Sequence, residues 1–235
     1  MAFGRTIFVS FFYGVFFSCS STQPLSTLEI VNASIYKIGS KEIRENIKNI
    51  VTIAECIGPN GKYRTIVHSD DSGYTYFKQI KEYETVQIYE AVIYDGKSGF
   101  TLGDTIQELS EEEIFVIRSH EFHQMLLSIN KRYNDFEIAK DTVSKDDHII
   151  HAITALGKSC SLFFNKRHQY LDKIVLINPD NANEFIITQV TNWKLIDQIY
   201  LPYKVTIQQG DNYYHFEFKE ILINSSNFKK IDINQ

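Results

Sequence analysis

The chain has 235 residues, a formal net charge of −5 and a hydrophobic content of 43%. This hydrophobic content is ordinary for a globular protein and excludes a largely disordered chain. The acidic balance, with no run of basic residues longer than two, argues against a nucleic acid as partner.

Residues 1–18 have the features of a signal peptide. Arg5 precedes an apolar run, Ile7–Phe17, which is too short to cross a bilayer as a helix and suits the apolar region of a signal peptide. The small residue before Cys19 makes the cleavage site resemble a lipobox, and Cys19 would then be acylated. The alternative is a plain secretory signal cut nearby, which leaves Cys19 unmodified. Either route takes the protein out of the cytoplasm, and acylation would make residues 19–25 a lipidated tether to a membrane.

Two helices are expected directly after this tether. Ser26 and Glu29 have the spacing of a capping box and open a helix whose apolar residues form one stripe. Gly39 is expected to end this helix, and Ser40 to cap a second, shorter one.

From residue 51 onward, most of the chain has the pattern of antiparallel strands. The expected strands are residues 51–57, 62–68, 74–83, 85–94, 136–143, 148–156, 160–164, 173–177, 185–193, 203–208 and 213–223, with a short broken strand within 100–109. Turn signals such as Pro59-Asn60-Gly61 and Gly210-Asp211-Asn212 separate them. Because ten or more consecutive strands would be long for a flat sheet, we expect the sheet to curl.

One long helix is expected in the middle of the strands. Ser110 and Glu113 form its capping box, and apolar residues recur at three- and four-residue intervals from Ile114 to Ile129. In front of it, Asp95-Gly96 and Gly99 are expected to supply the positive φ angles of a tight turn. The predicted architecture is mainly β with α (α+β): a curled antiparallel sheet forming an unclosed barrel, capped by two N-terminal helices and one central helix.

Several short motifs follow one another in a characteristic order along the mature chain. They are Gly-Ser-Lys-Glu (39–42), Gly-Pro-Asn-Gly (58–61), Tyr-Asp-Gly-Lys-Ser-Gly-Phe (94–100), Leu-Ser-Glu-Glu-Glu (109–113), Leu-Pro (201–202), Ile-Leu-Ile-Asn (221–224) and Phe228. This order resembles the outer-membrane lipoprotein-sorting family of LolA- and LolB-like proteins. The resemblance implies a single half-barrel domain over residues 26–235, with an apolar interior that accepts acyl chains and with no catalytic residues or cofactors.

On this resemblance we expect a periplasm-facing lipoprotein at the bacterial outer membrane that binds a lipid or a lipoprotein, as a sorting receptor or a lipid carrier, and that is not an enzyme. A lipidated Cys19 is more similar to the membrane-held receptor branch than to the soluble carriers. The expected partners are acyl chains and, through the N-terminal lipid, the membrane; a periplasmic carrier protein is a further candidate, and the expected state is a monomer. The residues expected to line the cavity are Tyr63, Val67, Tyr76, Val205, Phe216 and Phe218 from the barrel and Phe122 and Met125 from the helical lid.

Two alternatives for the function remain open. In the first, the aromatic residues fill the core, and the protein is a structural or interaction lipoprotein of the envelope. In the second, His120 and His123 hold a metal in a hydrolase. The metalloprotease motif places its histidines at i and i+4, whereas these lie at i and i+3 with no third ligand evident, so no metal site is predicted.

The two cysteines of the mature domain also leave a choice. Cys56 and Cys160 are expected to be buried free thiols, because two cysteines in so long a chain make no disulfide framework. A disulfide between them stays open as the alternative, since an oxidising envelope would permit it.

Overall fold

The computed structural model describes residues 25–81, 87–103, 105–140, 144–155, 157–178 and 181–231. The expected signal peptide, Cys19 and nearly all of the tether lie outside these residues. So do parts of five expected strands: the facing ends of 74–83 and 85–94, the ends of 136–143 and 148–156, and residue 104 of the short broken strand. In the described part, one antiparallel sheet has the strand order β6-β5-β4-β3-β2-β1-β13-β12-β11-β10-β9-β8-β7. Its outermost strands do not pair with each other, so the sheet is not closed into a barrel. The predicted fold class, mainly β with an unclosed antiparallel sheet, is confirmed.

The strands are β1 (Asn49–Gly58), β2 (Gly61–Asp70), β3 (Thr75–Lys81), β4 (Gln87–Ile93), β5 (Gly99–Thr101), β6 (Gln107–Glu108), β7 (Tyr133–Ile138), β8 (Asp147–Thr154), β9 (Ser159–Asn165), β10 (Leu171–Asn178), β11 (Asn181–Ile196), β12 (Ile199–Gln209) and β13 (Asn212–Ile223). The helices are α1 (Thr27–Ile38), α2 (Lys41–Glu45), α3 (Glu111–Ser119), α4 (Phe122–Leu127) and α5 (Ile129–Arg132). No helix of the described residues is both long and apolar enough to span a membrane.

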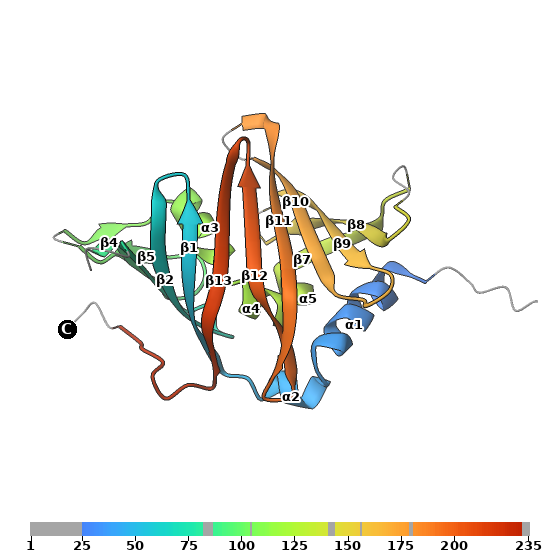
Figure 1. The fold of residues 1–235 in the computed structure, drawn as a ribbon, viewed down its shortest axis with the longest axis horizontal. Coiled ribbons are helices and arrows are strands. Elements are labelled where there is room, and N and C mark those ends of the chain that lie inside the picture. The colour runs from blue at the N-terminus through green and yellow to red at the C-terminus, as the bar shows by residue number, and fades with distance from the viewer. Residues whose placement is uncertain are drawn as a thin grey trace, which may run out of the picture.

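The first and last strands of the chain lie side by side at the middle of the sheet. β1 pairs with β2 on one side and with β13 on the other, so hairpins spread outward from this pair in both directions. The sheet twists strongly, and α4 and α5 lie across the same face of its central strands (Figure 1). This face is the concave one, and it positions the site described below.

Three apolar clusters form the interior. The largest lies between the concave face and the helices α1, α4 and α5, and includes Val31, Ile38, Leu126, Ile129, Ile150, Leu162, Phe164, Leu171, Ile199, Leu201, Val205, Phe216 and Phe218. The second joins α3 to β2, β3 and β4 through Val67, Phe77, Ala91, Ile93, Ile114 and Ile117. The third lies on the other face of β3 and β4, where Tyr74, Tyr76 and Val92 pack against Phe228 and Ile231. β3 and β4 are therefore covered on both faces, as their apolar side chains on both sides require.

The N-terminal ends of the helices agree with the sequence. Ser26 with Glu29, and Ser110 with Glu113, form the two capping boxes, and Ser40 caps α2. The prediction of a single long central helix, however, is wrong. The chain forms three short helices there, with breaks at Glu121, which has a ψ of 44°, and at Ser128. Glu121 is buried among ion-pair partners, and this tertiary contact holds its backbone outside helical geometry.

The predicted role of Gly99 is also wrong. Gly96 has the expected left-handed φ of 78°, whereas Gly99 is not among the residues with a positive φ and begins β5. A Cβ atom on Gly99 would collide with the carbonyl oxygen of Val92 and would lie 2.9 Å from Cδ1 of Leu109. Gly99 is needed because the neighbouring strand approaches closely, not because of its dihedral angle.

We expect Gly99→Ala to lower the free energy of unfolding by about 1–3 kcal/mol, because the added methyl group overpacks a strand pair that cannot separate without losing hydrogen bonds. Urea denaturation of the purified chain measures this change. Gly103→Ala is the matched control. The Cβ atom added at residue 103 would lie 4.0 Å from its nearest neighbour, the carbonyl oxygen of Thr105, so this variant should change stability by less than about 0.5 kcal/mol. Equal effects of the two substitutions would contradict the close-approach explanation.

Cys56 and Cys160 are both free and buried, as expected. Burial raises the pKa of each thiol to about 12. Because the thiolate is the reactive form, neither cysteine is suited to nucleophilic chemistry.

Candidate functional site

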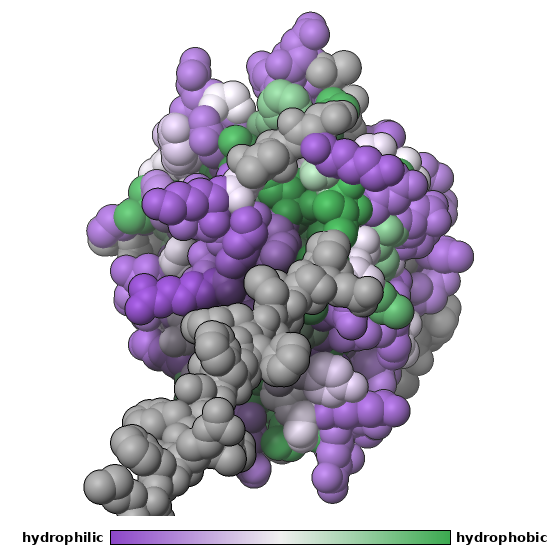
Figure 2. Space-filling model, turned by 90° about the vertical axis from the view of Figure 1, so that its right-hand side faces the viewer, coloured by the Kyte–Doolittle hydropathy of each residue, from purple (hydrophilic) through white to green (hydrophobic). Residues whose placement is uncertain are grey.

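A cavity of about 800 Å³ lies between the concave face of the sheet and the helices α3, α4 and α5. Its volume falls in the range of about 300–1,000 Å³ that is usual for small-molecule sites. Most of the surface that lines it is apolar, although polar and charged residues also take part. The apolar side chains include Tyr63, Phe77, Tyr89, Phe115, Phe122, Met125, Tyr133, Ile174, Leu176, Ile186, Ile207, Tyr214 and Phe216. Figure 2 shows a recess with a hydrophobic floor and a mostly hydrophilic rim on the side of the molecule that is on the right in Figure 1.

The structure brings four of the eight expected lining residues to this cavity: Tyr63, Phe122, Met125 and Phe216. Val205 and Phe218 are buried in the largest cluster beneath the helices, and Val67 packs in the cluster beside α3. Tyr76 lies on the opposite face of β3. Its neighbour Phe77 lines the cavity instead, because consecutive residues of a strand point to opposite faces.

Sequence reasoning missed several residues on the cavity wall. Ile207 and Tyr214 line the cavity, and they follow the same two-residue alternation as Val205 and Phe216. This alternation could have identified them. Leu176 and Ile186 come from β10 and β11, which meet α3–α5 only through the curvature of the sheet, and nothing in their local sequence indicates this proximity.

Aromatic rings join the helical cover to the floor of the cavity. The ring centroid of Phe216 lies 5.5 Å from that of Phe122 and 6.5 Å from that of Tyr63, and both pairs are edge-to-face. His120 lies 5.4 Å from Phe216 in the same arrangement. Such contacts depend on ring orientation, and they involve no buried charge.

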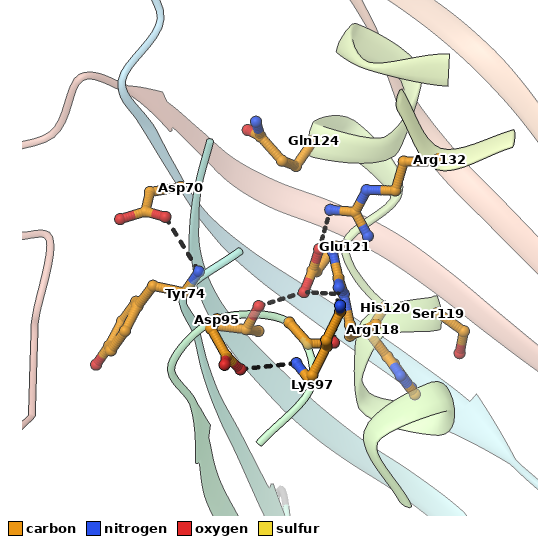
Figure 3. Close-up of polar contacts among 12 residues, drawn as sticks. Asp70, Tyr74, Asp95, Lys97, Arg118, Ser119, His120, Glu121, Gln124 and Arg132 are labelled. Atoms are coloured by element: carbon orange, nitrogen blue, oxygen red, sulfur yellow. Dashed lines mark hydrogen bonds and ion pairs between the residues drawn. The ribbon is translucent and has the colours of Figure 1, made fainter. Parts of the chain in front are cut away.

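A buried ionic cluster lies at the other side of the cover (Figure 3). Glu121 is 3% exposed and pairs with Arg132, accepts a hydrogen bond from Thr75 Oγ1, and lies 3.5 Å from Nε of Arg118. Arg118 Nη1 also donates to the carbonyl oxygen of Gly96 at 2.9 Å. These contacts connect α3, α4 and α5 to β3 and to the turn after β4. Burial lowers the pKa of Arg118, and its proximity to Glu121 opposes this shift and favours the charged guanidinium.

His120 and His123 each contact a backbone carbonyl oxygen through one ring nitrogen. His120 Nδ1 lies 2.8 Å from the carbonyl oxygen of Val116, and His123 Nε2 lies 2.9 Å from that of Pro202. Burial lowers the pKa of both, that of His123 to about 4, so both are neutral near pH 7. Within the part of the chain that the structure describes, no group of three or more His, Cys, Asp or Glu side chains could hold a metal ion.

Solved structures share this arrangement of an open sheet and helices. A LolA superfamily protein from Nitrosomonas europaea is 9% identical, with a TM-score of 0.62 over 88% of this chain and 99% of that chain. A domain described as an outer-membrane lipoprotein-sorting protein from Vibrio parahaemolyticus is 10% identical, with a TM-score of 0.56 over 89% and 96% of the two chains.

The chain has the LolA-like fold. A DUF1329 family protein from Desulfovibrio piger also shares the LolA-like fold, at 9% identity and a TM-score of 0.56 over 85% of this chain and 94% of that chain. No family model matches the sequence, and no curated protein is similar to it. The similarity is therefore one of structure, and it confirms the resemblance that the order of the motifs indicates.

Proposed function

We propose that this protein binds the acyl chains of a lipid or a lipoprotein in the cavity under α3–α5, as a non-enzymatic lipoprotein of the bacterial envelope. The observation that carries the proposal is an apolar cavity of about 800 Å³ on the concave face of a LolA-like sheet. Transfer of apolar surface from water into such a cavity is favourable by about 25 cal/mol per Å². The description of the Vibrio parahaemolyticus domain as a lipoprotein-sorting protein also supports it.

Entry of a chain into the cavity would require the helical cover to move. The edge-to-face contacts of Phe122 with Phe216 and Phe218 would be exchanged for contacts with the ligand, which are of similar apolar character. An exchange of this kind has a small net free energy, so a ligand can bias the cover between closed and open states. The ionic cluster around Glu121 would keep one side of the cover attached while the aromatic side opens.

The cellular setting is part of the same proposal. Acylation of Cys19 would anchor the chain to a membrane, and residues 26–235 would act as one monomeric half-barrel domain facing the periplasm from the outer membrane. A receptor held there would receive its cargo from a periplasmic carrier protein. In the hydrolase alternative, the other ring nitrogen of each residue, Nε2 of His120 and Nδ1 of His123, would bind the metal, but among the described residues no third His, Cys, Asp or Glu side chain joins them in a metal-binding group.

Native mass spectrometry of the full chain, extracted from its own membrane, tests the proposal. The expected result is a co-purifying lipid or acylated peptide on the protein, together with a mass increase at the mature N-terminus from acylated Cys19. A protein that carries no apolar ligand and takes up none when lipid is added would favour the alternative of an interaction lipoprotein.

Leu176→Glu should weaken the binding of an acyl chain at least tenfold, because it places a carboxylate in the apolar wall of the cavity. Ile177→Glu is the matched control: this neighbouring side chain is 47% exposed and does not line the cavity. Titration of the delipidated chain with a fluorescent fatty acid measures both variants. Similar losses in the two variants would place the binding surface elsewhere.

A further inference from the structure

One polar side chain on the cavity wall lacks a partner. Gln124, on α4, is 5% exposed and lines the cavity, and its Oε1 is buried without a hydrogen bond among the described residues. A buried amide oxygen without a partner is unfavourable, because it has lost its hydrogen bonds to water. Gln124 is therefore a point on the cavity wall at which a polar group of the ligand would be stabilised.

Positive charge also lies on the wall of this cavity. Arg118 and Arg132 also line the cavity, and Glu121, with its side chain 1% exposed, pairs with both. Figure 3 shows Gln124 and Arg132 extending from neighbouring helices above Glu121. A guanidinium has five N–H donors, and the hydrogen bond of Arg132 described in this structure, from Nη2 to Glu121, uses one of them.

The nearby carboxylates do not cancel this charge completely. Asp95 acts electrostatically on Arg118, but its carboxylate is exposed and accepts hydrogen bonds from the backbone of Lys97 and Ser98. Arg132 has Glu121 as its one carboxylate partner among the described residues, and Glu121 is shared with Arg118. Carboxylates and cations line the whole cavity in equal number: Asp71, Asp95, Glu112 and Glu113 against Lys97, Arg118, Lys131 and Arg132. The surplus of N–H donors and positive charge is therefore local, and it consists of the two guanidinium groups that share Glu121.

We propose that the ligand is an amphipathic lipid with an anionic head group, a carboxylate or a phosphate, which Arg132 and Gln124 bind while the acyl chain lies along Leu176, Ile186 and Ile207. The inference rests on the proposed function and adds the class of the head group. The Gln124 amide can rotate so that its N–H₂ faces an anion, since the amide oxygen and nitrogen occupy equivalent positions. Arginine binds carboxylate and phosphate oxygens through charge-assisted hydrogen bonds, which are stronger than hydrogen bonds between neutral groups.

Titration calorimetry of the delipidated full chain with three probes tests the inference. Palmitate, hexadecyl phosphate and hexadecanol share an unbranched saturated chain, and the first two carry the anion. Both anionic probes should bind at least about tenfold more tightly than the alcohol. Tighter binding of the phosphate indicates a phospholipid as the source of the head group, and tighter binding of palmitate indicates a fatty acid.

Gln124→Met keeps the shape of the side chain and removes its polar atoms. It should reduce the preference for the anionic probes about threefold or more, with a smaller loss of affinity for hexadecanol, whose single hydroxyl can also bond to the amide. Arg132→Lys keeps the charge beside Glu121 but removes the planar fork, and it should reduce the same preference. Gln189→Met, at an exposed residue of β11 that does not line the cavity, is the control and should leave all three affinities unchanged.

Equal affinity for the alcohol and the anions, or an unchanged preference in Gln124→Met, would overturn the assignment of the head group and leave the proposed function standing. Failure of all three probes to bind the folded wild-type chain would overturn both proposals.

Discussion

Glu121→Ala is expected to lower the free energy of unfolding by about 3–5 kcal/mol, the cost of removing one member of a buried ion pair. Arg132 and Arg118 would keep their charges, with side chains only 15% and 24% exposed, and would lose the carboxylate that neutralises them. Thr75 Oγ1 would lose its acceptor as well. Urea denaturation at pH 7 measures the change. We also expect increased amide exchange in α4 and α5, because Glu121 connects these helices to β3.

The matched control is Glu45→Ala. Glu45 pairs with Lys41 at 3.7 Å, but both side chains are more than 60% exposed, so the pair contributes little. This variant should change stability by less than about 0.5 kcal/mol. If Glu121→Ala were as mild as Glu45→Ala, the buried cluster would not be what attaches the helical cover to the sheet.

Acidification from pH 6.5 to pH 4 is expected to destabilise the protein strongly, because two buried histidines are neutral in the folded state. Burial lowers the pKa of His68 and of His123 from 6.5 to about 4. In this interval the unfolded chain binds protons that the folded chain does not bind, so the free energy of unfolding decreases as the pH falls. The change amounts to about 3 kcal/mol for each histidine and ends near pH 4, where the folded state also binds the protons.

The contacts of the two histidines explain why they remain neutral. His68 Nδ1 accepts a hydrogen bond from the backbone N–H of Lys229, and protonation would remove this acceptor. His123 is 2% exposed, and its ring lies 4.4 Å from that of Phe218. The pKa of Asp70 is lowered from 3.8, so its contribution is lost only below this interval.

Urea denaturation at pH 7, 5.5 and 4 measures the dependence on pH. His123→Gln should remove about half of the slope, although it also lowers stability at pH 7. His151→Gln, at an exposed histidine, should leave the slope unchanged. A stability that does not change between pH 7 and pH 4 would contradict the assignment of neutral buried imidazoles.

Much of the fold could be predicted because local rules and tertiary structure agree. The Ser26 and Ser110 capping boxes form as predicted, since each uses only atoms within four residues. The turn at Gly58–Gly61 and the alternation in β12 and β13 specify the hairpins and their register, because a slip by one residue would expose the apolar side chains. The number of consecutive strands indicated curvature.

The errors arose where distant residues decide the local structure. The apolar periodicity from Ile114 to Ile129 predicts a continuous helix. It carries no information on the ion pairs that Glu121 forms with Arg132 and Arg118. The helix is interrupted at Glu121, which Arg132 and Thr75 hold from other elements, whereas the pair with Arg118 has a spacing that a continuous helix allows. Gly99 carries the signature of a turn, whereas its environment is set by Val92 on the neighbouring strand.

For the candidate site, the sequence by itself determined that strands with one apolar face would surround an amphipathic helical segment, and it identified Tyr63, Phe122, Met125 and Phe216 on the cavity wall. Only the tertiary structure decided which face of β3 is concave, and so placed Phe77 rather than Tyr76 at the cavity. It also placed Gln124 beside Arg132. The alternation of a strand specifies two faces but not which of them is enclosed, because that choice depends on the sum of twist and packing over the whole sheet.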